Sequence, residues 1–528
     1  MRLLAAAGIV AGAGLAISIL QPAQPASFDV LIRSARVLDG SGNPWLRADV
    51  GISGDRIAAV GRLSGARGTT VVDAQDRVLA PGFIDVHSHA AEGLRRPELR
   101  QAQPILAQGV TTVVVNPDGG GPTDLAAQRA GLEKGRIGPN VALLIGHASV
   151  RREVLGSGKR APSDEELEQM KALVRRAMKE GAYGLSSGLF YAPGSYAATE
   201  EVIALAQAAG EFGGLYTSHI RDEGNYGIGV VAAVDEVIRI AEAANVIGIV
   251  SHMKALGPDS WGLSQAMTMR IDRARERGVQ VFADQYPYEA SSTSLRAALL
   301  PGGTDVPAAD RLEKEEQPPA ERAARESLEG TIRENIRRRG GADAIQIASY
   351  SPDRSLEGQT LAGIAKARGV PPETAALELI VRGSPSIVSF NMSEADIRHI
   401  MTRPYTMVSS DGGLVPMGAG QPHPRNYGAF ARRLGVYVRE RGITSLESAI
   451  RSMTSLPAAV FGLTDRGVIR AGAIADIVIF DPARIRDLAT YTNPHQLAVG
   501  VSWVLVNGVP VVADGKFTDA LPGRVLRK

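Results

Sequence analysis

The sequence predicts an α/β fold, in which a (β/α)8 TIM-like barrel carries a small β-sandwich domain formed by both chain ends. Three observations support this prediction. With 528 residues, the chain is too long for one ordinary core, so two or three domains are expected. Strand-like and helix-like segments alternate through the middle of the chain. Short strand-like segments separated by turn residues occupy both ends.

These patterns set the expected domain boundaries. We predict a first part of the β domain over residues 27–80, a barrel over 81–460, and a second part of the β domain over 461–528. A charged stretch at 310–340 is best explained as a solvated helical insertion.

The composition is that of a globular protein and narrows the classes of function. Hydrophobic residues make up 44% of the chain, charged residues 22%, and the net charge is +2. This balance gives no indication of a nucleic-acid partner or an acidic partner surface. The chain has no cysteine, which excludes disulfides, thiolate metal ligands and a cysteine nucleophile.

Residues 1–26 have the pattern of a targeting segment. Met1-Arg2 supplies a positive charge, residues 3–20 are uninterruptedly small and apolar, and a Gln- and Pro-containing stretch follows. This pattern predicts a signal peptide for export. An N-terminal membrane anchor remains an alternative, because no good A-x-A cleavage site is present and the apolar run is long enough for a marginal span. Both alternatives place the body of the protein outside the cytoplasm, in the periplasm or another extracytoplasmic space.

Both ends of the chain are predicted to be β. Asn507-Gly508 is typical of a hairpin turn, and Gly- and Ser-rich turns separate the other segments. The expected strands are 29–33, 35–38, 49–52 and 56–60 in the first part, and 467–469, 475–481, 501–506 and 509–512 in the second.

The middle of the chain alternates between strand-like and helix-like segments, as repeated βα units do. The expected strands are 83–86, 111–115, 141–145, 184–186, 215–218, 247–251, 279–283, 344–348 and 406–409. The clearest helices between them are 164–179, 200–212, 229–244 and 264–277.

The first of these strands ends in two histidines, His87 and His89. Residues i and i+2 of a strand point to the same side, so both imidazoles would reach one point in space. Neutral imidazole is the commonest metal-binding side chain. Taken alone, the pair is equally well explained as two surface histidines.

Polar residues also follow the other predicted strands, and the carboxyl ends of strands form the active site of a parallel barrel. Four of the eight histidines lie at such ends. Nitrogen and oxygen donors without sulfur suit zinc, and manganese, iron or cobalt remain alternatives. The residues that follow the strands are Asp118, His219, His252 with Lys254 beyond it, Asp284 to Tyr286, and Asp411.

Several motifs together resemble the amidohydrolase superfamily and, more closely, its N-acyl-D-amino-acid deacylases (D-aminoacylases). They span residues 80 to 430, and the β segments at both ends are similar to the composite β domain of that family. The motifs are APGFIDVHSH (80–89), GVTTVVV (109–115), GLSSGL (184–189), APGSY (192–196), SHIRDEG (218–224), DQYPY (284–288) and HPRNYG (423–428).

The resemblance implies a site for one or two zinc ions. His87, His89 and Asp411 would hold one metal position, and His219 and His252 would hold the other. Asp118 stands where the family often has a cysteine ligand. It is expected to be a further ligand, although a loop role beside the three glycines that follow it is an alternative.

The resemblance also assigns roles around the substrate, a small N-acylated D-amino acid. Asp411 would act as general base and then as general acid. Lys254, Tyr286 and Arg425 would anchor the substrate carboxylate, with surface charge as the alternative for the lysine and arginine. Two further candidates are Tyr191, as a donor to the carbonyl, and Arg296, as a partner for an acidic side chain or simply a loop arginine.

Three further histidines, His147, His399 and His495, are not expected to be metal ligands. His147 follows a strand and is expected to support the site or the fold, whereas His399 and His495 are expected to be surface or packing residues.

The predicted activity is metal-dependent hydrolysis of N-acyl-D-amino acids to a carboxylate and a free D-amino acid. One alternative is a hydrolase of the same fold that acts on dipeptides containing D-amino acids, on cyclic amides or on lactones. A second alternative, a non-catalytic exported binding protein, is disfavoured by the intact ligand set. A membrane is an expected partner only if the N-terminal segment stays uncleaved.

Overall fold

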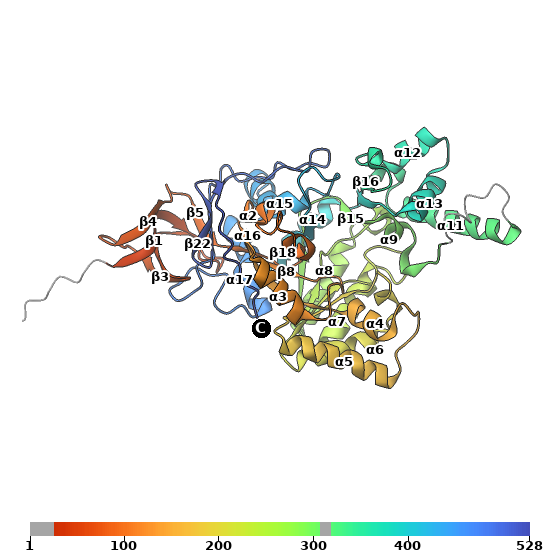
Figure 1. Cartoon of the computed structure of the whole chain (residues 1–528), viewed down its shortest axis with the longest axis horizontal. Coiled ribbons are helices and arrows are strands. Elements are labelled where there is room, and N and C mark those ends of the chain that lie inside the picture. Colours follow the sequence, from red (N-terminus) through yellow and green to blue (C-terminus); the bar gives the residue numbers. More distant parts are fainter. Residues whose placement is uncertain (1–25, 307–317) are drawn as a thin grey trace, which may run out of the picture.

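The structure, a computed structural model, describes residues 26–306 and 318–528. The predicted targeting segment, residues 1–26, lies outside the described residues except for Ala26. Within the described part, no helix has the length and apolar character needed to cross a membrane. Figure 1 shows the β domain at one end of the molecule, the barrel in the middle and a separate group of elements at the other end.

Nine parallel strand segments occupy the eight positions of the barrel, because two consecutive segments share one position. Their hydrogen-bonded order is β6-β8-β9 followed by β10-β11-β12-β13-β14-β18, and only Leu144 separates β9 from β10. The strands are β6 (Phe83–Asp85), β8 (Val110–Val115), β9 (Asn140–Leu143), β10 (Ile145–Gly146), β11 (Gly184–Gly188), β12 (Leu215–His219), β13 (Gly248–Val250), β14 (Val281–Gln285) and β18 (Thr406–Val408).

The first and last strands meet just beyond their carboxyl ends. There β7 (Ser88–His89) pairs in parallel with β19 (Gly412–Gly413), and the Asp411 amide donates to the His87 carbonyl at 2.9 Å. This contact closes the ring of strands at the level of the predicted metal ligands.

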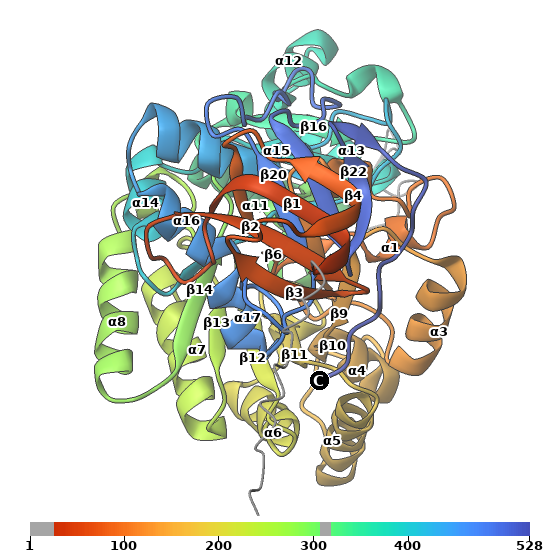
Figure 2. The ribbon, with the colours of Figure 1, turned by 90° about the vertical axis from the view of Figure 1, so that its left-hand side faces the viewer.

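Amphipathic helices cover the outside of the barrel (Figure 2). In α5 (Asp164–Lys179), Ser163 and Glu166 form a reciprocal capping box that fixes the first turn. The same helix buries Met170 and Val174, which lie one turn apart on one face. The other predicted helices are present as α6 (Thr199–Gly210), α7 (Val230–Ala244) and α8 (Ser264–Glu276).

Both chain ends contribute to one continuous nine-stranded sheet, in which β5 pairs with β20. Buried Val, Ile and Leu side chains from both ends share its core. The predicted fold class, a barrel with a β domain formed by both ends, is therefore confirmed. The strands are β1 (Ser27–Val37), β2 (Leu46–Ser53), β3 (Arg56–Gly61), β4 (Arg67–Asp73), β5 (Val78–Pro81), β20 (Ile477–Phe480), β21 (Val501–Val506), β22 (Val509–Ala513) and β23 (Lys516–Phe517).

One glycine links this sheet to the barrel. Gly82 lies between β5 and β6, and a Cβ atom there would lie 2.2 Å from the Thr111 hydroxyl oxygen. No side chain fits such an approach, so only glycine allows the two strands to follow each other directly.

An insertion between β14 and β18 has its own core and its own antiparallel sheet. The segment 344–348 was predicted to be a barrel strand, and this placement is wrong, because it belongs to that sheet as β16. Its apolar pattern is that of any buried strand and does not specify a partner. The sheet consists of β15 (Ser291–Ser294), β16 (Ile345–Ser349) and β17 (Ser386–Ser389), and the helices are α9 (Leu295–Leu299), α11 (Pro319–Arg338), α12 (Leu361–Arg368) and α13 (Pro372–Arg382).

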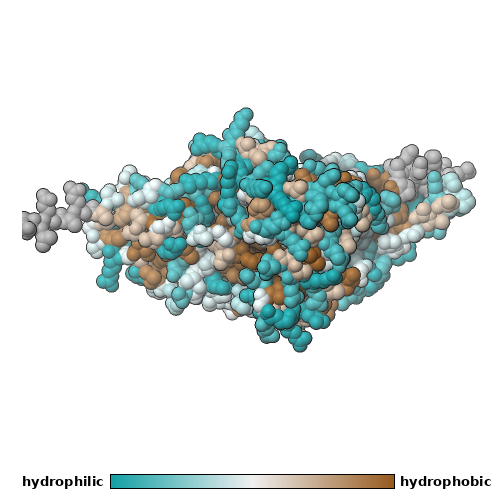
Figure 3. Space-filling model, turned by 90° about the horizontal axis from the view of Figure 1, so that it is seen from below, coloured by the Kyte–Doolittle hydropathy of each residue, from teal (hydrophilic) through white to brown (hydrophobic). Residues whose placement is uncertain are grey.

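The charged stretch predicted as a solvated helix is only partly solvated. Residues 307–317 lie outside the described residues, and α11 covers 319–338. This helix buries Leu328, Ile332 and Ile336 in the core of the insertion. In Figure 3, hydrophilic residues cover much of the visible face and hydrophobic residues are scattered among them.

Candidate metal centre and active site

A cavity of about 470 Å³ lies at the carboxyl ends of the barrel strands, between the barrel and the sheet of the insertion. Most of the predicted site residues line it, although they come from distant parts of the chain. Those that do are His89, Asp118, Tyr191, His219, His252, Lys254, Tyr286, Asp411 and Arg425.

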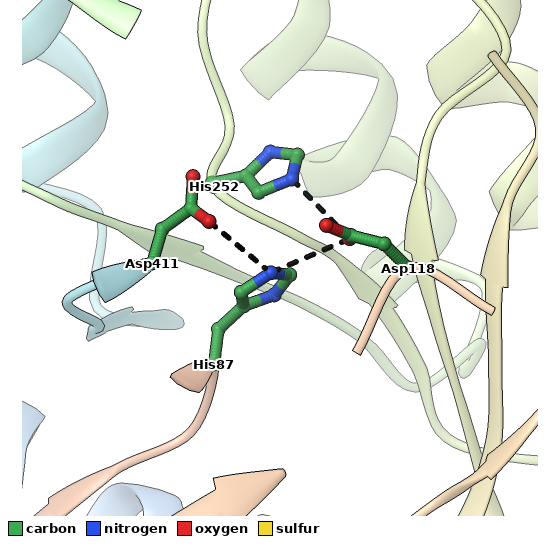
Figure 4. Close-up of side chains that lie close together, drawn as sticks. All are labelled: His87, Asp118, His252 and Asp411. Carbon is green, nitrogen blue, oxygen red and sulfur yellow. Dashed lines mark ion pairs between the residues drawn. The ribbon is translucent and has the colours of Figure 1, made fainter. Parts of the chain in front are cut away.

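A first cluster contains His87, Asp118, His252 and Asp411, and all of these except His87 line the cavity (Figure 4). One ligand atom from each residue lies within 4.8 Å of the others. The His87 Nε2 atom is 3.3 Å from Asp118 Oδ1 and 3.6 Å from Asp411 Oδ1. The His252 Nε2 atom is 3.5 Å from the same Asp118 oxygen.

A second cluster contains His219, Glu223 and His252. The His252 Nδ1 atom lies 3.0 Å from Glu223 Oε1, and the His219 Nε2 atom lies 3.8 Å from Glu223 Oε2. The two imidazoles approach each other to 2.9 Å. His252 therefore belongs to both clusters.

Asp118 joins the predicted ligands that come from different strands. Its Oδ2 atom lies 3.3 Å from His89 Nε2, and its Oδ1 atom lies 4.0 Å from His219 Nδ1 in addition to the contacts above. The His89 Nε2 atom also lies 3.1 Å from Asp411 Oδ1. This central position favours the ligand role for Asp118 over a loop role.

The backbone of three cluster residues lies in the left-handed region, which non-glycine residues rarely adopt. The φ angle is 56° at Asp118, 34° at His252 and 49° at Asp411. Such conformations persist where surrounding contacts over-determine them, and they concentrate at functional sites.

Two buried aspartates supply those surrounding contacts. Asp284 Oδ1 accepts hydrogen bonds from the His252 amide at 2.9 Å and from the Ser409 hydroxyl at 2.6 Å. Asp85 accepts from the Ser410 amide at 2.9 Å, directly before Asp411. Each aspartate thus fixes the backbone at the end of a neighbouring strand.

The buried donor atoms of the site fit a metal ion. Among the described residues, both His87 ring nitrogens, Asp118 Oδ1 and His219 Nε2 are buried without a hydrogen-bond partner. Buried polar atoms are rarely left without a partner, so this group indicates a bound species. Nitrogen and oxygen donors in this number suit zinc.

The charge states of the site residues follow from their burial and from their neighbours. Burial lowers the pKa of His219 to about 4 and so keeps its imidazole neutral, as a metal ligand must be. Burial acts to raise the pKa of Asp118, but the charge of His87 and of the other histidines around it outweighs burial and holds this carboxyl well below its usual range. Burial also acts to lower the pKa values of His89 and His252, but the carboxylates around them outweigh it and raise these values to about 9 and about 10. The site therefore presents ionised carboxylates with one neutral imidazole, and a bound metal would displace the protons of the other two.

The predicted anchors of the substrate carboxylate lie together on one wall. Lys254 contacts Glu223, and its Nζ atom is 2.8 Å from His252 Nδ1. Arg425 Nη1 donates to Asp411 Oδ2 at 2.6 Å, and its guanidinium lies 4.7 Å from the centre of the Tyr286 ring. Both cations are buried, so surface charge does not explain them.

Two other predicted substrate residues have different positions. The Tyr191 hydroxyl lines the cavity and lies 3.2 Å from the Thr293 hydroxyl. Arg296 is exposed on α9, where its Nη2 atom donates to the Thr304 carbonyl at 3.0 Å, and it does not line the cavity. This exposed position outside the cavity favours the alternative, in which Arg296 is an ordinary arginine without a role in substrate binding.

Glu223 has no role in the sequence prediction, although the structure places it in the second cluster. It stands four residues after His219, beyond the end of β12. Strand periodicity gives no direction for a side chain in a loop, so only its presence in the motif of residues 218–224 signalled it. No motif signalled Arg339 either, although this residue also lines the cavity.

Three of the four other histidines do not line the cavity, and the fourth, His423, does. His399 Nε2 lies 2.8 Å from the Thr268 hydroxyl, and His495 Nδ1 lies 2.7 Å from the Tyr427 hydroxyl. His147 is fully buried behind the site, with Nε2 2.9 Å from Glu201 Oε1.

Glu201 also pairs with the fully buried Arg151, and this pair makes Glu201→Gln a strongly destabilising change. We expect a loss of about 3–5 kcal/mol in the free energy of unfolding, because the substitution leaves a buried guanidinium without a counter-ion. Glu200→Gln is the matched control, since its partner Arg239 is exposed. Urea unfolding followed by circular dichroism measures both, and equal losses would contradict the prediction.

The same pair predicts how stability depends on pH. Burial acts to raise the pKa of Glu201, but hydrogen bonds from His147 and Arg151 outweigh it, so the pKa lies below its ordinary value. Stability from a carboxyl with a lowered folded-state pKa is present above its unfolded pKa of about 4.5 and is lost as the pH falls. The Glu201→Gln variant should therefore lose less stability than the parent when the pH falls from about 5 to about 3.

The sequence matches the amidohydrolase family over residues 70–512. An N-acyl-D-glutamate deacylase from Alcaligenes xylosoxydans xylosoxydans is 38% identical over 522 residues, which cover 95% of this chain and 96% of the relative. A D-aminoacylase from the same organism is 36% identical over 526 residues, which cover 95% and 98%.

A solved structure agrees with these sequence matches. It is an N-acyl-D-glutamate deacylase from Bordetella bronchiseptica, complexed with zinc and a phosphonate inhibitor that mimics the tetrahedral intermediate. The TM-score is 0.80 at 37% identity, and the match covers 95% of this chain and all of the other. The chain therefore belongs to the amidohydrolase family, in the branch of the N-acyl-D-amino-acid deacylases (D-aminoacylases).

Proposed function

We propose that the protein hydrolyses the amide bond of N-acyl-D-amino acids in a metal-dependent reaction and releases a carboxylate and a free D-amino acid. The observation that carries this proposal is the position of the unpartnered histidine and aspartate donors beside a wall of buried cations. Relatives that act on N-acyl-D-glutamate and other N-acyl-D-amino acids, over nearly the whole chain, support it.

The metal would be zinc, as in the related structure complexed with zinc. Zinc, when bound, supplies Lewis acidity, which makes water a stronger acid and a carbonyl a better electrophile. The residues that would hold one or two ions are His87, His89, Asp118, His219, His252 and Asp411, together with Glu223.

Asp411 would transfer the proton. Its Oδ1 atom faces His87 and His89, whereas its Oδ2 atom accepts from Arg425. Burial acts to raise the pKa of Asp411, but the Arg425 guanidinium outweighs it and keeps the carboxylate ionised, ready to accept a proton from the attacking water. The Asp411 carboxyl would then return the proton to the leaving nitrogen.

Arg425, Lys254 and Tyr286 would bind the carboxylate of the amino acid. Arg425 touches both Asp411 and the Tyr286 ring, so a carboxylate held by this arginine lies next to the proton-transferring group. Binding at this point would place the amide bond, two bonds away from the carboxylate carbon, beside the metal cluster.

A substrate screen tests the proposal. The zinc-loaded protein should hydrolyse N-acetyl-D-leucine, -glutamine and -glutamate, and it should leave the L-enantiomers essentially untouched. Amine release, followed with a fluorogenic reagent, measures both series. Preference for L-substrates would contradict the proposal, and faster turnover of D-amino-acid dipeptides, cyclic amides or lactones would favour the same-fold alternative.

We also propose that residues 1–26 direct export. The positively charged start and the apolar run that follows support this. Mass spectrometry of the protein from a cell fraction outside the cytoplasm should show a chain that begins near residue 27. A full-length chain in the membrane fraction would indicate an anchor, and a full-length chain in the cytoplasm would contradict the proposal.

A further inference from the structure

Arg339 is a buried cation in the wall of the cavity that the proposed reaction does not use. It follows directly after α11, lines the cavity and is only 2% exposed. A guanidinium stays protonated in proteins, so this side chain carries its charge into the interior. Its position differs from that of the exposed Arg296, which lies on the same insertion.

The partners of Arg339 are neutral. Its Nε atom donates to the Ala298 carbonyl at 3.3 Å, and its Nη1 atom donates to the Asn391 side-chain oxygen at 3.0 Å in the orientation that satisfies that amide. In residues 26–306 and 318–528, no carboxylate lies within the 4.0 Å of an ion pair with it. The other two cations of the cavity, Lys254 and Arg425, each contact a carboxylate.

An unpaired buried charge is costly, and proteins usually provide an anion for it. Tyr226 strengthens this argument, because its ring lies 5.8 Å from the Arg339 guanidinium carbon and its buried hydroxyl has no hydrogen-bond partner among the described residues. Both side chains line the same cavity. The wall thus offers a hydroxyl without a partner and a positive charge that no carboxylate of the described residues neutralises.

This wall is separate from the place of the amino-acid carboxylate. Two aromatic contacts connect it to the metal cluster, since the Tyr226 ring packs on Phe190 at 5.4 Å and Phe190 packs on His219 at 5.9 Å. Arg425, in contrast, contacts Asp411 directly. An anion at Arg339 therefore lies several atoms away from the amide bond.

We propose that Arg339, together with Tyr226, binds a second carboxylate of the substrate. This inference rests on the proposed function and specifies its substrate class as N-acyl-D-amino acids with an additional carboxylate. The carboxylate belongs either to the amino-acid side chain, as in D-glutamate, or to a dicarboxylic acyl group, as in an N-succinyl substrate.

The test compares charged substrates with neutral ones of the same shape. The substrates are N-acetyl-D-glutamate against N-acetyl-D-glutamine, and N-succinyl-D-leucine against its succinamoyl counterpart. In the zinc-loaded parent enzyme, kcat/KM should favour the charged member of one pair. Arg339→Gln should reduce that ratio by about 100-fold, because the carboxylate loses its charged partner. The affected pair identifies which part of the substrate carries the carboxylate.

The ratio within one variant does not depend on how much of that variant is folded, so a loss of stability does not imitate the result. Arg296→Gln is the matched control and should leave the ratio unchanged. A ratio that survives Arg339→Gln, or that falls only in Arg296→Gln, would overturn the inference. If the parent hydrolyses neither pair nor N-acetyl-D-leucine, the proposed function is wrong, and calorimetric binding of glutarate to the parent and to Arg339→Gln still tests the anchor.

Discussion

Asp411→Asn is expected to lower kcat for an N-acyl-D-amino acid by about 10²- to 10⁴-fold, the contribution typical of a general base, with the zinc retained. The amide keeps the size of the side chain and one oxygen facing His87 and His89, but it cannot accept the proton of the attacking water. Steady-state kinetics measures the rate, and elemental analysis of the dialysed protein measures the metal.

Asparagine is the right substitution because of the backbone. Asp411 has a φ of 49°, a conformation that asparagine adopts more readily than alanine does. Asp514 has the same φ of 49° and is exposed in the β domain, so Asp514→Asn controls for the change of residue type in this conformation. If Asp411→Asn binds zinc and retains more than about a tenth of the parent kcat, the assigned role is wrong.

Removal of the metal is the second change with a large expected effect. Treatment with a chelator should abolish hydrolysis, and added zinc should restore it. Without the ion, the carboxylates of Asp118, Glu223 and Asp411 remain crowded in a buried site with donors that lack partners. A fully active metal-free protein would contradict the proposed reaction.

The stability of the protein should follow the metal in the same experiment. A ligand that binds only the folded state stabilises it by about 4 kcal/mol at 1,000 times its Kd. Thermal unfolding of the chelated protein should therefore begin at a lower temperature, and zinc should reverse the shift. Magnesium is the control ion, because it prefers oxygen ligands and should restore neither activity nor stability. If zinc restored activity without raising the unfolding temperature, the metal would not be bound within the folded core.

The histidines at the ends of the barrel strands were predictable as site residues because the geometry of a parallel barrel fixes where such side chains lie. His87, His219 and His252 each stand at or next to the end of an apolar run, where a parallel barrel collects its functional side chains. The sequence therefore indicated both what these side chains can bind and where they lie. The same reasoning found Asp118 and Asp411, although their left-handed backbone is a property of the folded structure.

The sequence did not predict how the insertion between β14 and β18 folds and packs. Residues 344–348 look like any buried strand, and only their partner β17 places them outside the barrel. Arg296 and Arg339 are both arginines without a periodic pattern, and their opposite degrees of exposure depend on how α9 and α11 pack. Long-range packing decides such cases, and a local pattern does not contain it.

The pairing of β5 with β20 has a consequence for the order in which the protein is made. Ala80 lies opposite Val478, so the N-terminal strands of the sheet are synthesised long before the strand that completes them. Until the last part of the chain emerges, one edge of β5 lacks its partner and is open to wrong strand pairing. Chains that stop before Ile477 should therefore aggregate even though they contain every residue of the metal centre.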